Sequence, residues 1–265
     1  MRIGCCANMV RQIGDDIGIE RLEAIAAAGY DYIELPLAQM IELCDEEFES
    51  LTVRIKKSGI CCEVCNNFFP SSIILTGNSV DQRLTERYVD IALERVKKLG
   101  VSIIVFGSSE AKNVPEGFEY DSAWKQIVNL LRMVNKKIAR HKINIVIEPL
   151  CKAESNIVNN TREGLKLTEE VNREHIKLLV DFYHMNMEKE DMCILEEITG
   201  YLQHIHIANP NGRVFPRPDD GVDYKEFFRN IKQAGYNGRV SIEAYTDNFE
   251  QDIITALETM HAADL

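Results

Sequence analysis

The sequence predicts a single α/β domain in which eight parallel strands, each followed by a helix, close into a barrel. Three observations support this fold. Short apolar runs typical of strands alternate with stretches of helical periodicity along the whole chain. The repeat is close to the roughly 30 residues of a strand-helix-strand unit. The length of 265 residues is near the roughly 250 that are usual for such a barrel. We therefore expect one domain over residues 1–265.

The first half of the chain predicts four strands with helices between them. Gly29 and Gly100 end two of the helices, since glycine readily takes the left-handed conformation that closes a helix. Pro36 stops the second strand, because proline has no backbone N–H to donate. The expected strands are residues 3–6, 32–35, 60–64 and 102–106, and the expected helices are residues 17–28, 45–57 and 81–99.

The second half continues the same alternation. Helices are expected at residues 124–140, 161–171, 191–199, 224–234 and 249–262. The four strands between them are marked by the runs Ile145-Val146-Ile147-Glu148, Leu178-Leu179-Val180-Asp181, His204-Ile205-His206 and Val240-Ser241-Ile242-Glu243. Eight strand-helix units in one domain indicate a (β/α)8 barrel, the TIM barrel fold.

Each of these last four strands finishes with a side chain that can bind a metal. Glu148, Asp181, His206 and Glu243 are separated by 33, 25 and 37 residues, about one repeat each. The active sites of such barrels lie at the carboxyl ends of the strands, so we expect the four side chains to converge. Taken singly, an acid at a strand end could instead cap the next helix or face solvent. Four in succession favour a shared site.

The donor set indicates which ion would bind. Two Glu, one Asp and one His are mostly hard oxygen ligands, which suit Mn²⁺, Mg²⁺ or Co²⁺ better than a structural zinc. Without a cation, clustered carboxylates would repel one another. We therefore expect one divalent cation. His204 points the same way as His206 along the strand but one layer deeper, so we expect it behind the metal ligands.

Composition narrows the class of partner. The net charge of −12 and a pI near 5.1 repel phosphate backbones, so we expect no nucleic-acid partner. Because no stretch reaches the roughly 18 apolar residues of a membrane span, we also expect no membrane partner. The apolar run at the N-terminus is too short for a signal peptide, which favours the cytoplasm.

The eight cysteines are interpreted as reduced thiols. Cys5, Cys6, Cys61, Cys62 and Cys65 lie on apolar, strand-like segments, where a free cysteine serves as a small buried hydrophobe. Cys62 and Cys65 form a Cys-x-x-Cys pair. No second pair completes a zinc site, so we do not assign a metal or redox role there.

Four motifs in the second half resemble a known family. They are Glu148-Pro149-Leu150 with Glu154; Asp181-Phe182-Tyr183-His184-Met185-Asn186; His204-Ile205-His206 followed by Arg213; and Ser241-Ile242-Glu243. Together they resemble the xylose-isomerase-like TIM barrel superfamily of sugar isomerases and epimerases. Within it, the sequence is most similar to the ketose 3-epimerases, the D-tagatose and D-psicose 3-epimerase group.

The resemblance implies a function and roles for individual residues. Glu148, Asp181, His206 and Glu243 would hold one divalent ion, Mn²⁺ in first place, with Mg²⁺, Co²⁺ or Zn²⁺ as alternatives. Glu148 and Glu243 would also form the catalytic acid/base pair, and Glu154, His184 and Arg213 would bind the sugar substrate. A homodimer or homotetramer is also implied.

The expected reaction is epimerisation of a ketose at C3 through an enediolate. Such a reaction needs two acid/base groups on opposite faces of a planar intermediate, each worth about 10²- to 10⁴-fold in rate. The alternatives within the superfamily are aldose-ketose isomerisation, hydroxypyruvate isomerisation, inosose dehydration and apurinic endonuclease activity. A non-catalytic sugar-binding barrel is a further alternative.

The sequence leaves the sugar and its phosphorylation state open. Cys5-Cys6 end the first strand where those epimerases commonly have an aromatic residue, and Arg213 follows His206 by seven residues, one more than expected. The aromatic residues that could line the pocket lie at or after strand ends: Phe68, Phe69, Phe106, Phe182 and Tyr245.

Overall fold

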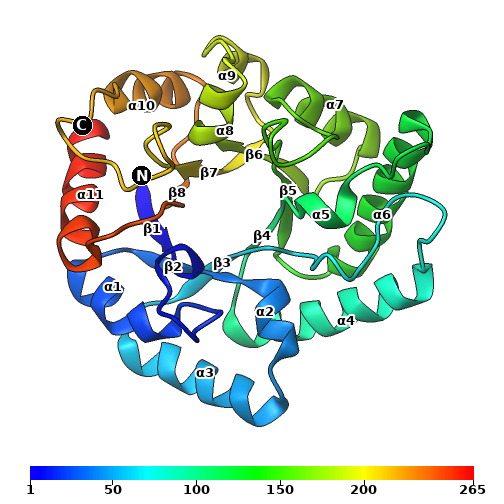
Figure 1. Cartoon of the computed structure of the whole chain (residues 1–265), viewed down its shortest axis with the longest axis horizontal. Coiled ribbons are helices and arrows are strands. Elements are labelled where there is room, and N and C mark those ends of the chain that lie inside the picture. The colour runs from blue at the N-terminus through cyan, green and yellow to red at the C-terminus, as the bar shows by residue number, and fades with distance from the viewer.

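The structure, a computed structural model that describes residues 1–265, is a closed barrel of eight parallel strands (Figure 1). Each strand pairs with its neighbours in chain order, and β8 returns to β1. The strands are β1 (Arg2–Cys6), β2 (Tyr32–Pro36), β3 (Cys62–Asn66), β4 (Ile103–Phe106), β5 (Asn144–Ile147), β6 (Ile176–Asp181), β7 (Leu202–Ile207) and β8 (Arg239–Ile242). The predicted fold class is confirmed.

Helices form a ring outside the barrel, as Figure 1 shows. Their buried faces pack against the strands and against neighbouring helices, so that a continuous apolar core surrounds the barrel. The helices are α1 (Leu22–Ala28), α3 (Asp45–Ser58), α4 (Gln82–Leu99), α6 (Tyr120–Ile138), α7 (Thr161–Val171), α9 (Ile194–Glu197), α10 (Tyr224–Gln233) and α11 (Phe249–Ala263).

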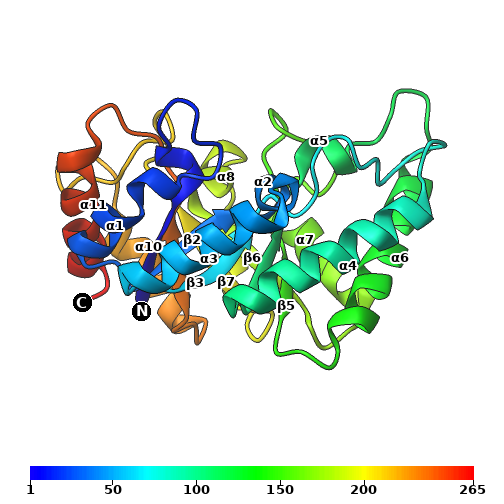
Figure 2. The same ribbon diagram turned by 90° about the horizontal axis from the view of Figure 1, so that it is seen from below.

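Five further short helices follow or precede the regular elements. These are α2 (Leu37–Glu42), α5 (Ser109–Lys112), α8 (Phe182–Met187) and the 3₁₀ turns η1 (Ala7–Val10) and η2 (Ile19–Arg21). In Figure 2, α5 and α8 lie toward the end of the barrel away from the two chain termini. The sequence did not predict α2, α5 or α8, because four to six residues are too few to show helical periodicity.

Several predicted boundaries were wrong. The helix expected at residues 124–140 begins four residues earlier and runs from Tyr120 to Ile138. The helix expected from residue 17 begins at Leu22, because the left-handed Gly18 (φ 88°) starts a 3₁₀ turn first. The strand expected at residues 60–64 lies two residues later and runs to Asn66. The helix expected at residues 191–199 shortens to Ile194–Glu197.

Alternating strand positions separate the barrel interior from the layer between strands and helices. Six buried residues form a cluster distinct from the main core: Tyr32, Val64, Ile103, Val105, Val146 and Leu179. Because side chains alternate along a strand, Glu34 shares the face of Tyr32, Glu148 that of Val146 and Asp181 that of Leu179. The strands therefore carry acidic side chains toward one end of the interior.

All eight cysteines are free thiols. The Cys62 thiol donates to the Val64 carbonyl at 3.4 Å, and Cys65 is also buried. Cys61 was expected to be buried but is exposed, since it precedes β3 and does not belong to the strand. No helix has the length and apolar character needed to cross a membrane.

Candidate metal centre and active site

The structure brings the four predicted metal ligands together. Glu148 follows β5 directly, Asp181 ends β6, His206 is the penultimate residue of β7, and Glu243 follows β8. Their side chains are all buried, and one ligand atom from each lies within 4.8 Å of those of the other three. Strands that are neighbours in a parallel barrel end at the same rim, which explains the convergence.

His206 lies between the two glutamates. Its Nδ1 is 3.0 Å from Oε1 of Glu148 and 3.2 Å from Oε2 of Glu243. Burial alone would lower the pKa of His206, but Glu243, Glu34 and Glu148 raise it well above its ordinary value. The ring is therefore held in a strongly negative environment, as expected for a site that attracts a cation.

The two glutamates differ electrostatically. Burial raises the pKa of Glu148, with His206 opposing the effect. Burial would also raise the pKa of Glu243, but the positive charges of His206 and Arg213 lower it to about 2. The pKa of Asp181 is raised by burial, against the effect of Arg213.

Arg213 reaches the centre from the loop after β7. Its guanidinium donates to Oε1 of Glu154 at 2.9 Å, contacts Glu243 and lies 3.4 Å from Oδ2 of Asp181. It also stacks over the Tyr183 ring, 4.8 Å from the centroid. Arg213 therefore provides positive charge beside two of the four candidate ligands.

His184 lies on α8, whereas the sequence had placed it in a loop. The Asp181 side chain caps this helix by accepting from the Tyr183 N–H at 2.8 Å. Nδ1 of His184 accepts from the Cys151 N–H at 3.2 Å, so the ring proton is on Nε2. That Nε2–H has no hydrogen-bond partner, although Asp181 lies 3.5 Å away. The atom is buried, and His184 does not line the cavity that opens onto the site.

A cavity of about 530 Å³ opens onto these residues. Glu148, Glu154, Arg213 and Glu243 line it, with polar side chains from the loops after the early strands: Asn8, Arg11, Gln39, Asn67, Ser71 and Ser108. Of the aromatic residues proposed for the pocket, Phe69 and Tyr245 line it. The other three, Phe68, Phe106 and Phe182, are buried in the core.

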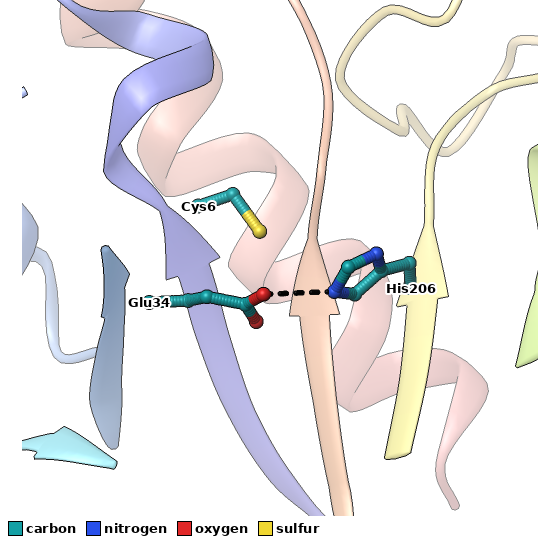
Figure 3. Close-up of side chains that lie close together, drawn as sticks. All are labelled: Cys6, Glu34 and His206. Atoms are coloured by element: carbon teal, nitrogen blue, oxygen red, sulfur yellow. Dashed lines mark hydrogen bonds and ion pairs between the residues drawn. The ribbon is translucent and has the colours of Figure 1, made fainter. Parts of the chain in front are cut away.

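Glu34 on β2 is the site residue that the sequence did not reveal. It is fully buried, and its Oε1 lies 3.0 Å from Nε2 of His206 (Figure 3). The other ring nitrogen, Nδ1, is the one that contacts Glu148 and Glu243. The available signal was a glutamate in an otherwise apolar strand, since a buried charge requires partners. His204, expected behind the ligands, is likewise bonded to Glu34 at 3.0 Å.

The arrangement fits one divalent cation. Three carboxylates and one imidazole supply hard ligand atoms from four different strands, and no lysine or arginine intervenes between them except Arg213 at the edge. Two other groups also bring three donors within 4.8 Å: Cys6-Glu34-His206 and Cys151-Glu154-His184.

A family model described as Xylose isomerase-like TIM barrel matches residues 22–263, nearly the whole chain. The chain belongs to this family. The resemblance seen in the sequence is thereby confirmed.

Curated relatives of the family are similar over most of their length. A D-psicose 3-epimerase from Ruminiclostridium cellulolyticum is 24% identical over 238 residues, which cover 84% of this chain and 77% of the relative. A 2-oxo-tetronate isomerase from Pectobacterium atrosepticum is 27% identical over 249 residues, which cover 89% of this chain and 90% of the relative. A crystal structure of a D-psicose 3-epimerase in the presence of D-fructose superposes with a TM-score of 0.88 at 18% identity. The superposition covers 100% of this chain and 99% of that structure. The relatives support an enzyme of the isomerase class.

Proposed function

We propose that this protein is a metal-dependent epimerase of a small ketose, acting at C3 with Glu148 and Glu243 as the acid/base pair. The observation that carries the proposal is that carboxylate oxygens of both glutamates contact the same atom, Nδ1 of His206. A carboxylate oxygen of Asp181 lies within 4.8 Å of these ligand atoms. Relatives named as D-psicose 3-epimerases support the choice of a ketose.

Glu148, Asp181, His206 and Glu243 would hold the cation, with Mn²⁺ as our first choice. When bound, a divalent ion would polarise the ketose carbonyl and stabilise the negative charge of the enediolate. The residues present fit this ion by number, charge and ligand type.

The two glutamates supply what epimerisation requires. A proton leaves the carbon next to the carbonyl on one face, and another is delivered to the same carbon from the other face. Glu148 and Glu243 extend from β5 and β8, on different sides of the cavity rim. In this scheme one is the carboxylate that takes the proton, and the other is the acid that returns one.

Three further residues would hold the sugar. The Nε2–H of His184 is buried and unpartnered, 3.5 Å from Asp181, and in this proposal it donates to a substrate oxygen once the sugar is bound. Arg213 keeps its proton at any working pH, so it donates to hydroxyl or carbonyl oxygens and does not act as a base. Glu154 accepts from Arg213 and lines the cavity, where it can also accept from a hydroxyl group.

A second candidate is isomerisation of a small 2-oxo sugar acid. The 2-oxo-tetronate isomerase relative supports it, since the match covers 90% of that protein. One residue of the cavity also favours it: the guanidinium of Arg11 bonds only to the Asn8 carbonyl, at 3.1 Å, and forms no ion pair. A free guanidinium is suited to a substrate carboxylate.

The test is a substrate panel with the purified protein and Mn²⁺. Free ketohexoses, ketopentoses and a 2-oxo-tetronate are each incubated with the protein, and products are identified by chromatography and NMR. The C3 epimer of a ketose is the expected product, and treatment with a chelator should abolish its formation. A product in which the carbonyl has moved would favour the second candidate. No conversion of any compound would contradict both.

A further inference from the structure

The interior of the barrel beneath the proposed metal centre contains a charged residue that none of the proposed chemistry uses. Glu34, from β2, has no exposed surface, and neither do its neighbours Cys6, His204 and His206. Figure 3 shows the Glu34 carboxylate directed from β2 toward the His206 ring on β7. A carboxylate buried this deeply requires hydrogen bonds to both of its oxygens.

The structure supplies those hydrogen bonds. Oε1 of Glu34 faces Nε2 of His206 at 3.0 Å. Oε2 accepts from the Ser241 hydroxyl at 2.6 Å and faces Nε2 of His204 at 3.0 Å. The Tyr32 hydroxyl lies 2.9 Å from the Ser241 oxygen and completes the chain of donors. The groups that bond directly to Glu34 come from β7 and β8, whereas Tyr32, on β2 itself, bonds to Ser241.

This contact determines which nitrogen of His206 can bind a cation. An ionised carboxylate can only accept, so the hydrogen bond to Glu34 requires the proton on Nε2. Nδ1, on the other side of the ring, lies 3.0 Å from Glu148 and is the nitrogen that faces the other ligands. A hydrogen bond to the distal nitrogen of a ligating histidine fixes its tautomer and its ring orientation.

We propose that Glu34 is the positioning residue of the metal centre: it holds the Nε2–H of His206 so that Nδ1 presents its lone pair to the cation. This inference rests on the proposed function, because it assumes that His206 binds a metal. Glu34 itself touches neither cation nor substrate. Its negative charge also makes the imidazole a stronger ligand.

The alternative reading of the same residues is a second cation bound by Cys6, Glu34 and His206, whose ligand atoms lie within 4.8 Å of one another. The hydrogen bond argues against it, because Nε2 of His206 already donates to Glu34 and offers no lone pair. Our proposal therefore expects one cation per chain.

The first experiment measures metal affinity without reference to activity. The chelator-treated wild type and the variant Glu34→Gln are titrated with Mn²⁺ by calorimetry, and bound metal is counted after dialysis. The amide lacks the negative charge and a second accepting oxygen, so E34Q should bind Mn²⁺ about 10- to 100-fold more weakly, with circular dichroism unchanged. The matched control Ser241→Ala removes a donor from the other oxygen, Oε2, and should stay within about threefold of the wild type.

Affinity of E34Q within threefold of the wild type would overturn the role of Glu34 and leave the proposed function standing. A wild type that binds no divalent cation would contradict the proposed function and this inference together. If the wild type bound two cations per chain and Cys6→Ala bound only one, the proposal would be overturned. Cys6, Glu34 and His206 would then form a second metal site, and Glu34 would be a ligand instead of a hydrogen-bond partner of His206.

A second measurement needs no variant. In the wild type labelled with ¹⁵N-histidine and loaded with diamagnetic Mg²⁺, long-range ¹H–¹⁵N spectra report the tautomer of each ring. Our proposal requires the His206 proton on Nε2. A proton on Nδ1 would overturn it, even if E34Q failed to fold.

Discussion

Gly107 packs so closely against the carboxylate of Glu148 that only glycine fits at position 107. A Cβ there would lie 2.2 Å from Oε2 of Glu148. Gly107 follows β4 directly, and Glu148 follows β5, the next strand of the barrel. The glycine therefore leaves the space that the Glu148 carboxylate needs to reach His206.

We predict that Gly107→Ala displaces this carboxylate while the barrel remains folded. A displacement of about 1 Å at a catalytic group can cost roughly 10²-fold in rate, so kcat should fall by about that factor. Steady-state kinetics with circular dichroism checks it. Ser102→Ala, just before the same strand at its other end, is the control and should retain near-wild-type kcat. Normal turnover in G107A would show that Glu148 tolerates another position.

Under the proposed mechanism, the variants Glu148→Gln and Glu243→Gln remove one proton-transfer group each and one metal ligand each. We predict that either loses at least 10²- to 10⁴-fold in kcat, the usual contribution of an acid/base group, and binds metal more weakly. Turnover at saturating Mn²⁺ separates the two effects. Glu174→Gln, an exposed residue ahead of β6, is the matched control. Activity surviving in either site variant would disprove the acid/base pair.

Arg213 supplies positive charge to Glu154, Asp181 and Glu243 when no cation is bound. Removing one partner of a buried ion pair typically costs about 3–5 kcal/mol, because the remaining charge is left unpaired. We predict that Arg213→Gln lowers the melting temperature most strongly in a chelator and less with Mn²⁺, which compensates Asp181 and Glu243. Thermal unfolding under both conditions is the measurement. Equal losses would show that metal and Arg213 do not act on the same carboxylates.

Lys112 on α5 predicts a dependence of stability on pH. It is fully buried and donates to the Gly107 carbonyl, and burial lowers its pKa to about 7, with Glu148 and Glu154 opposing the effect. The unfolded chain keeps this proton up to its ordinary pKa of 10.5. Between these values the unfolded state binds more protons, so this residue makes stability rise with pH.

We predict that Lys112→Met removes this contribution. The slope of unfolding free energy against pH between 7 and 10.5 should fall by about 1.4 kcal/mol per pH unit in the middle of the window. Urea unfolding at several pH values measures it. Lys125→Met, on the exposed side of α6, is the control and should leave the slope unchanged. An unaltered slope in K112M would mean that Lys112 is protonated in the folded protein.

The sequence predicts the barrel and the convergence of the four candidate ligands well, because both depend on local patterns. Glu148, Asp181, His206 and Glu243 each stand at the end of an apolar run, and the parallel topology brings such ends together. Short helices such as α8 were missed, since a single turn has no periodicity of its own. The Glu34–His206 contact joins residues 172 positions apart and depends on barrel closure, which no local pattern reports.

The most direct test of the central claim is hydrogen exchange at the carbon next to the ketose carbonyl. The Mn²⁺-loaded wild type and E148Q are incubated in D₂O with the ketoses of the panel, and deuterium at C3 is measured by NMR. We predict incorporation at C3 with the wild type and none after chelation, whereas E148Q should exchange at most one epimer of each pair, the one that Glu243 deprotonates. Absence of deuterium at C3 from every ketose, with metal bound to the wild type, would contradict the account.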